Sequence, residues 1–198
     1  MRLALLQIIY IFVVPVLLIY FGVLPVDFRV IILFSVTLLV VGIMRHEKFS
    51  HEDAGFTDPW WKYFLWYLGA FVVGLLCTIY SEKILPIGPS MHWWENKRLL
   101  TLFIPVSILQ EVLYRSFLMH KLKSLFTNMW TVILSNTFLF TLLHIIYPQK
   151  HIMLPFAFFA GLMFSYIYYK KPNIVLISIL HSVLNFIAVY LGFFVLPS

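Results

Sequence analysis

Three apolar segments in the C-terminal half of this chain contain ionisable and amide side chains. A charged side chain at the centre of a membrane-spanning helix costs about 2.5–3.5 kcal/mol on insertion scales. Such residues are retained in membrane proteins where they pair with one another or take part in function. The side chains in question are Gln110, Glu111 and Arg115 in ILQEVLYRSFL, His144 in FLFTLLHIIYP, and His181 and Asn185 in ILHSVLNF.

These groups are of the kinds that hydrolysis requires. A carboxylate or an imidazole can accept a proton from water, while a second histidine and an amide can donate hydrogen bonds to a developing oxyanion. His144 and His181 could also bind a divalent metal such as zinc. Glu111 and Arg115 are four residues apart, so a charge pair that only fixes helix packing is an equally good interpretation of those two residues alone. The whole cluster of buried titratable groups points instead to chemistry or transport.

The elements that must position these side chains are membrane-spanning helices. The chain is 62% apolar and 11% charged, whereas soluble domains are about half apolar and a quarter charged. Each span needs roughly 20 mostly apolar residues. We therefore expect an all-α, polytopic transmembrane helical bundle of about seven spans, forming a single integral membrane domain over residues 1–198. The expected spans are 3–24, 28–45, 60–80, 99–119, 129–147, 152–169 and 174–196.

The predicted helix ends do not place the candidate residues at one depth. Counted from the membrane side that they share, Glu111 and His181 lie about 12 Å from the ends of their helices, whereas His144 lies nearer ~20 Å. A late start or a tilt of the helix over residues 129–147 would bring His144 level with the other two. Without such a shift the three residues do not form one site.

Two further patterns describe the architecture. The small residues Ala157, Gly161 and Ser165 recur at four-residue spacing, which predicts close packing of their helix against its neighbours. The stretch from Arg45 to Pro59 is the most polar part of the chain and is predicted to be a loop.

Lysine and arginine are more frequent on the side of the bundle that holds the N-terminus. With seven spans, the loops and span ends on that side carry eight of these residues and the opposite side carries five. The positive-inside rule then predicts a cytoplasmic N-terminus. The small size of the chain favours the bacterial cytoplasmic membrane. The expected partner is the lipid bilayer. The sequence has no basic cluster that would indicate binding to nucleic acid.

The order and spacing of three motifs resemble those of the CAAX-protease and bacteriocin-processing (CPBP, or Abi) family of intramembrane proteases. The similarity covers about residues 99–190, and a protease-like core is expected over residues 99–196. The motifs are Gln110-Glu111-x-x-x-Arg115, Phe140-x-x-x-His144 and His181-x-x-x-Asn185.

The resemblance implies a helical bundle around a cavity that opens to one membrane face. It implies that the glutamate and the first histidine activate a water molecule, and that the second histidine and the asparagine polarise the scissile carbonyl of a peptide or membrane-protein substrate. The family is often described as metalloproteases, which would make His144 and His181 the metal ligands. On this basis the catalytic residues are Glu111, His144, His181 and Asn185, supported by Gln110, Arg115 and Phe140.

One position departs from the family pattern. The family motif begins with two adjacent glutamates, of which the first is usually assigned as the base, and here that position is Gln110. An amide cannot act as a general base near neutral pH. An enzyme would then use Glu111 or His144 as its base. Alternatively, the chain is a catalytically degenerate member that regulates a partner or confers immunity to a peptide toxin. A small transporter is a third interpretation, which the lack of an inverted repeat disfavours.

Overall fold

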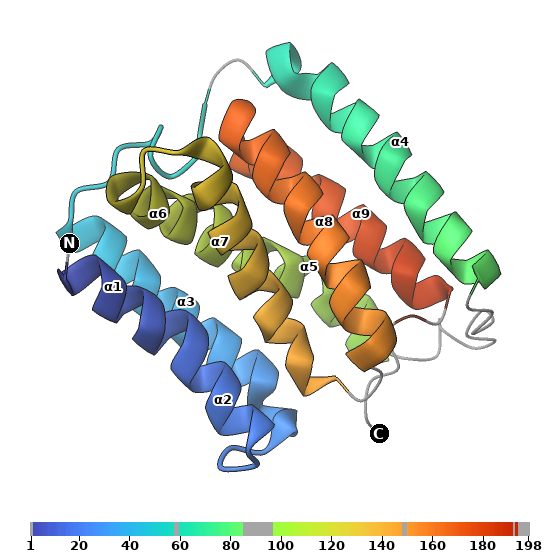
Figure 1. Ribbon diagram of the computed structural model, residues 1–198, viewed down its shortest axis with the longest axis horizontal. Helices are drawn as coiled ribbons and strands as arrows, with labels where there is room; N and C mark the ends of the chain where they lie inside the picture. The colour runs from blue at the N-terminus through green and yellow to red at the C-terminus, as the bar shows by residue number, and fades with distance from the viewer. Residues whose placement is uncertain (1, 58–59, 85–96, 148–149, 192, 194–198) are drawn as a thin grey trace.

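Apolar runs of membrane-crossing length form helices because a helix satisfies its backbone hydrogen bonds within the segment. The computed structural model describes residues 2–57, 60–84, 97–147, 150–191 and 193, and over these residues its regular elements are all helical (Figure 1). The first half contains α1 (Arg2–Ile8), the π-helical segment η1 (Ile9–Val13), α2 (Val14–Tyr20), the 3-10 turn η2 (Val26–Phe28), α3 (Arg29–His46) and α4 (Trp61–Ile84). The second half contains α5 (Lys97–Glu111), the π-helical segment η4 (Val112–Leu118), α6 (Met119–Leu125), α7 (Met129–Leu142), the 3-10 turn η5 (Leu143–Ile146), α8 (Lys150–Lys170) and α9 (Ile174–Tyr190).

Seven helical segments follow one another along the described chain, which confirms the predicted fold class. Six of them are long and apolar enough to cross a membrane, and the seventh, α9, is a shorter apolar helix of 17 residues. The chain is therefore an integral membrane protein. The last span was predicted to reach residue 196, but α9 ends at Tyr190, and residues 194–196 lie outside the described residues.

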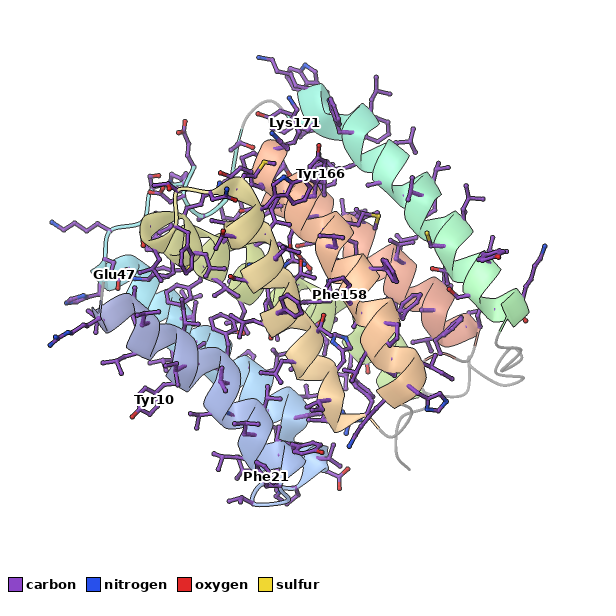
Figure 2. All side chains as sticks on the ribbon, in the orientation of Figure 1. Tyr10, Phe21, Glu47, Phe158, Tyr166 and Lys171 are labelled. Atoms are coloured by element: carbon purple, nitrogen blue, oxygen red, sulfur yellow. The ribbon has the colours of Figure 1, made fainter. Side chains whose placement is uncertain are left out.

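The outer faces of the bundle are apolar. Figure 2 shows the side chains of Tyr10 and Phe21 pointing away from the other helices, and both are well exposed. Exposed apolar surface on this scale is stable where lipid replaces water around the protein.

The fourth helical segment is longer than the sequence predicted. Its expected end was residue 119, whereas α5, η4 and α6 run on without a break to Leu125. Lys121 was expected to mark a turn but lies within α6, where it is buried and forms an ion pair with Glu47. The aliphatic stem of a lysine can pack on apolar surface while its charge meets a partner, and the Lys121 ammonium lies 5.3 Å from the centre of the Phe117 ring.

The polar loop between α3 and α4 covers one end of the bundle. Ser116 donates a 2.7 Å hydrogen bond to the carbonyl of Ala54, and the backbone N–H of Ile174 donates one of 2.8 Å to the carbonyl of Gly55. Gly55 adopts φ +85°, a left-handed conformation that favours glycine. The loop therefore joins the fourth segment to the start of α9, which is buried beneath it at Ile174.

A charged contact strengthens the same end. Glu47, labelled in Figure 2, accepts a 2.9 Å hydrogen bond from Gln7 and pairs with Lys121. Partial burial alone would raise the pKa of Glu47, but the hydrogen bonds from Lys121 and Gln7 outweigh it and hold that pKa below its ordinary value. This contact links α1, the end of α3 and α6.

Close helix packing brings the motif-bearing helices together. Helix α7 packs along α8, and α9 packs against both α5 and α4. A Cβ atom at Gly161 of α8 would lie 2.9 Å from Cδ1 of Phe140 on α7, so glycine is needed for this approach. Ala157 and Ser165 of the small-residue stripe are buried as well, and Ser165 contacts α7 through Asn136.

Candidate active site

Glu111 is the centre of a fully buried polar cluster. His181 Nδ1 donates a 2.6 Å hydrogen bond to Glu111 Oε1, and Arg115 Nε lies 3.2 Å from Glu111 Oε2. Glu111 and Arg115 have no exposed side-chain surface, and His181 is 3% exposed. The carboxylate is thus held from two sides, by a cation one helical turn away and by an imidazole from α9. A buried charge is stable only with such partners.

Arg115 is held by aromatic rings and by an amide. Its guanidinium carbon lies 5.1 Å from the centre of the Phe140 ring and 5.8 Å from that of Phe164. Arg115 Nη1 also donates a hydrogen bond to the side-chain oxygen of Asn136. Guanidinium groups bind well at such sites because they are planar and weakly hydrated.

His144 lies one helical turn after Phe140 and contacts its ring. Its Nδ1 is 3.0 Å from the carbonyl of Phe140. A carbonyl can only accept, so Nδ1 carries the proton and the neutral ring has its lone pair on Nε2. The Phe140 ring lies 5.1 Å from the His144 ring and 5.8 Å from the His181 ring, centre to centre. Phe140 therefore contacts both imidazoles.

Asn185 and Gln110 have different surroundings. Asn185 Nδ2 donates a 3.0 Å hydrogen bond to the hydroxyl of Ser107, which in turn donates to the carbonyl of Phe103. One Nδ2 hydrogen of Asn185 remains for another acceptor, since an amide has two. Gln110 is 7% exposed, and its side chain forms no hydrogen bond within the described part of the chain.

A cavity of about 780 Å³ lies beside this cluster, between α4 and α8. Its lining is mostly apolar and aromatic, and His144, His181 and Asn185 are among its few polar groups. A pocket of this size and character is typical of a ligand-binding site. Of the candidate residues in the described chain, Phe140 also lines it, whereas Glu111, Gln110 and Arg115 do not.

The depth mismatch expected from the sequence is resolved by the positions of the helix ends. Because the fourth segment extends to Leu125, Glu111 lies about 21 Å from its end, close to the ~22 Å between His144 and the start of α7. Helix α9 starts deeper in the bundle, beneath the α3–α4 loop, which brings His181 to the same level. No late start of α7 is involved.

The donor atoms of the described residues do not make a catalytic metal site. Catalytic zinc takes three protein ligands, and no group of three or more His, Cys, Asp or Glu side chains suited to a metal occurs in the described ranges. In addition, Nδ1 of His181 is bound to Glu111. The chemistry of the site is therefore derived from the side chains themselves, without a metal.

The polar roles of three residues of the cluster were not predicted from the sequence. Asn136 and Ser107 are fully buried, and they bind Arg115 and Asn185 respectively. Ser165 was treated only as a small packing residue, but its hydroxyl donates a 3.0 Å hydrogen bond to Asn136. The available signal was helical spacing, because Asn136 is one turn before Phe140 and Ser107 is one turn before Gln110.

The family model described as type II CAAX prenyl endopeptidase Rce1-like matches residues 92–187, a range that contains all three motifs. No curated protein and no solved structure matches the chain.

Proposed function

We propose that this chain is an intramembrane endopeptidase, because its residues 92–187 match the Rce1-like family of type II CAAX prenyl endopeptidases. It hydrolyses a peptide bond in a membrane-associated protein or peptide. The observation that carries this proposal is the buried Glu111–His181 hydrogen bond next to a cavity that is lined by His144, His181 and Asn185. We assign the proteolytic core to residues 99–196. We place the protein in a bacterial cytoplasmic membrane with its N-terminus inside.

His144 is the proposed general base. Its Nε2 lone pair can take a proton from a water molecule in the cavity, because Nδ1 is occupied by the Phe140 carbonyl. The water oxygen then attacks the scissile carbonyl carbon. His144, now charged, returns the proton to the leaving amine, which restores the neutral ring.

His181 and Asn185 are the proposed donors to the oxyanion. His181 donates from Nε2 when that nitrogen is protonated, and Asn185 donates from its second Nδ2 hydrogen. Both side chains are already oriented, His181 by Glu111 and Asn185 by Ser107. Donors fixed before the reaction stabilise the transition state without reorganising during it.

Glu111 acts through His181 in this scheme. It does not line the described cavity, and both of its carboxylate oxygens face buried partners. Its carboxylate accepts from Nδ1 of His181 and fixes the orientation of the ring, as a buried carboxylate does for a catalytic histidine. Glu111 is thus a positioning residue, whereas His144, His181 and Asn185 touch the substrate or the attacking water.

Gln110 favours a second candidate function. At this position the family's usual base is replaced by an amide, which takes no proton at neutral pH. A chain that retains the cavity but lacks activity would bind a peptide or partner protein without cutting it, as an immunity factor or membrane regulator does.

The test is cleavage of a membrane-anchored peptide library by the protein purified in detergent. Wild type is compared with Glu111→Ala, His144→Ala and Gln110→Glu. His151→Ala is the matched control, because His151 lines the same cavity outside the Glu111 cluster.

Cleavage by wild type and by His151→Ala, with cleavage lost in His144→Ala and Glu111→Ala, is the result that we expect. Cleavage that appears only after Gln110→Glu would overturn the enzyme assignment and support the binding function. Full activity in His144→Ala would remove His144 as the base.

A further inference from the structure

Asn136 makes three hydrogen bonds at the centre of the bundle. Its side-chain oxygen accepts from Arg115 Nη1 and from the Ser165 hydroxyl at 3.0 Å. Its Nδ2 donates a 2.7 Å hydrogen bond to the carbonyl of Tyr114. Asn136 has no exposed surface. The residue thus ties α7 to η4 and α8 at one point.

The orientation of the Asn136 amide follows from its partners. A guanidinium can only donate and a backbone carbonyl can only accept, so the oxygen must face Arg115 and the nitrogen must face Tyr114. The Tyr114 carbonyl lies in the π-helical segment η4 and accepts the backbone N–H of Met119, five residues on. Short π-helical segments often occur at functional sites. Here the widened turn carries Arg115, next to Glu111.

A continuous series of contacts connects Asn136 to His181, one of the proposed donors to the oxyanion. Asn136 binds Arg115, Arg115 Nε lies against one oxygen of Glu111, and the other oxygen accepts from His181. Each member is at least 97% buried. In such surroundings a hydrogen bond is strong and a missing partner is costly, so a change at one end alters the geometry at the other.

We propose that Asn136, together with Ser165, is a positioning residue that sets the orientation of His181 through Arg115 and Glu111. The proposal rests on the proposed peptidase function. Asn136 holds one side of the guanidinium, so that Nε stays beside the Glu111 carboxylate, 3.2 Å from Oε2. The fixed carboxylate then keeps the His181 ring in the rotation in which it can donate to the scissile carbonyl. Ser165 holds the oxygen of the Asn136 amide in place.

The experiment compares Asn136→Leu and Ser165→Ala with a matched control, Thr37→Val. Leucine has the same number and branching of side-chain heavy atoms as asparagine but no acceptor for Arg115. Thr37 is also buried, and its hydroxyl donates to the carbonyl of Leu33 in its own helix, so the control removes a buried hydrogen bond outside the cluster. Two quantities are measured in detergent: kcat and KM for the cleaved peptide, and the NMR resonance of the His181 Nδ1 proton, assigned by its loss in His181→Gln.

A positioning role predicts a fall in kcat of about 100-fold for Asn136→Leu with KM unchanged, because a small misorientation of a catalytic group has an effect of this size. For Ser165→Ala, which removes the neutral hydrogen bond to Asn136, the fall is about fivefold. The downfield His181 resonance moves upfield in both variants. Thr37→Val leaves kcat and the resonance as in wild type.

An unchanged His181 resonance in both Asn136→Leu and Ser165→Ala would overturn the proposal. If Asn136→Leu does not fold, Ser165→Ala carries the test alone. If wild type cleaves no peptide, the peptidase function fails but the resonance still reports the contact series, so the two failures are distinguishable. Equal losses of kcat in Ser165→Ala and Thr37→Val would reduce Ser165 to a packing residue and overturn its part in the proposal.

Discussion

Glu111 and His181 are 70 residues apart in the sequence, and their side chains form a 2.6 Å hydrogen bond inside the bundle. The contact joins the end of α5 to the middle of α9. Glu111 also pairs with Arg115. The carboxylate therefore contacts one residue that stabilises the fold, Arg115, and one that takes part in the proposed chemistry, His181. Substitutions at Glu111 should therefore affect stability as well as activity.

We expect Glu111→Gln to lower the free energy of unfolding by about 3–5 kcal/mol, because it leaves the buried Arg115 guanidinium without its counter-charge. Equilibrium unfolding with a denaturing detergent measures this loss. In the double variant Glu111→Gln/Arg115→Met no buried charge remains, so its stability should lie closer to wild type than that of the single variant. Losses that simply add would show that the two charges are not coupled.

The number and order of the helices could be predicted from the sequence, but one helix end could not. Apolar length indicates a span directly. The end at Leu125 was missed because lysine is typical of interfacial positions and the ion-pair partner of Lys121, Glu47, is more than 70 positions away. A single error of six residues produced the false difference in depth between Glu111 and His144.

The sequence predicted the motif residues but not the residues of other helices that form hydrogen bonds with them. Spacing of four residues shows that Glu111 and Arg115, or His181 and Asn185, share a helix face. It does not show which face of another helix they meet. The roles of Asn136 and Ser107 depend on such contacts between helices, and the π-helical turn at Val112–Leu118 has no known sequence signal here.

Asn185→Ala should lower kcat by about 100-fold if Asn185 donates to the oxyanion. Ser107→Ala should have a smaller effect in the same direction, because Asn185 keeps its donor but loses the group that orients it. Ser178→Ala, also buried in α9 and outside the lining of the described cavity, is the control and should retain activity. The measurement is single-turnover cleavage. A normal rate in Asn185→Ala would assign the oxyanion contact to His181 alone.

Gly161→Ala should reduce both stability and activity. The added Cβ would lie 2.9 Å from Phe140 Cδ1, and the displaced ring contacts His144 and His181. Overpacking of this kind costs about 1–3 kcal/mol. Gly69→Ala in α4 is the control, since its Cβ would meet no atom within 4 Å. The temperature of unfolding and the rate of cleavage are measured for both variants. If Gly161→Ala is as stable and active as Gly69→Ala, α8 can move away from Phe140 without loss of stability or activity.

Acid should remove the stabilising effect of Glu47. The folded protein holds the pKa of Glu47 below its ordinary value of 4.5 through the contacts with Lys121 and Gln7. As the pH falls, the unfolded chain takes up the proton first, so the stability that Glu47 contributes is present above about pH 4.5 and is lost as the pH falls through the folded pKa.

The measurement is the difference in thermal stability between wild type and Glu47→Gln as a function of pH. We expect wild type to be more stable by about 1 kcal/mol at pH 7, and the difference to shrink below about pH 4.5. Glu52→Gln is the control, because Glu52 is exposed in the same loop and forms no ion pair with the described residues. A difference that stays constant down to pH 3 would mean that Glu47 stabilises the α1–α3–α6 end by packing, and that its charge on Lys121 contributes nothing.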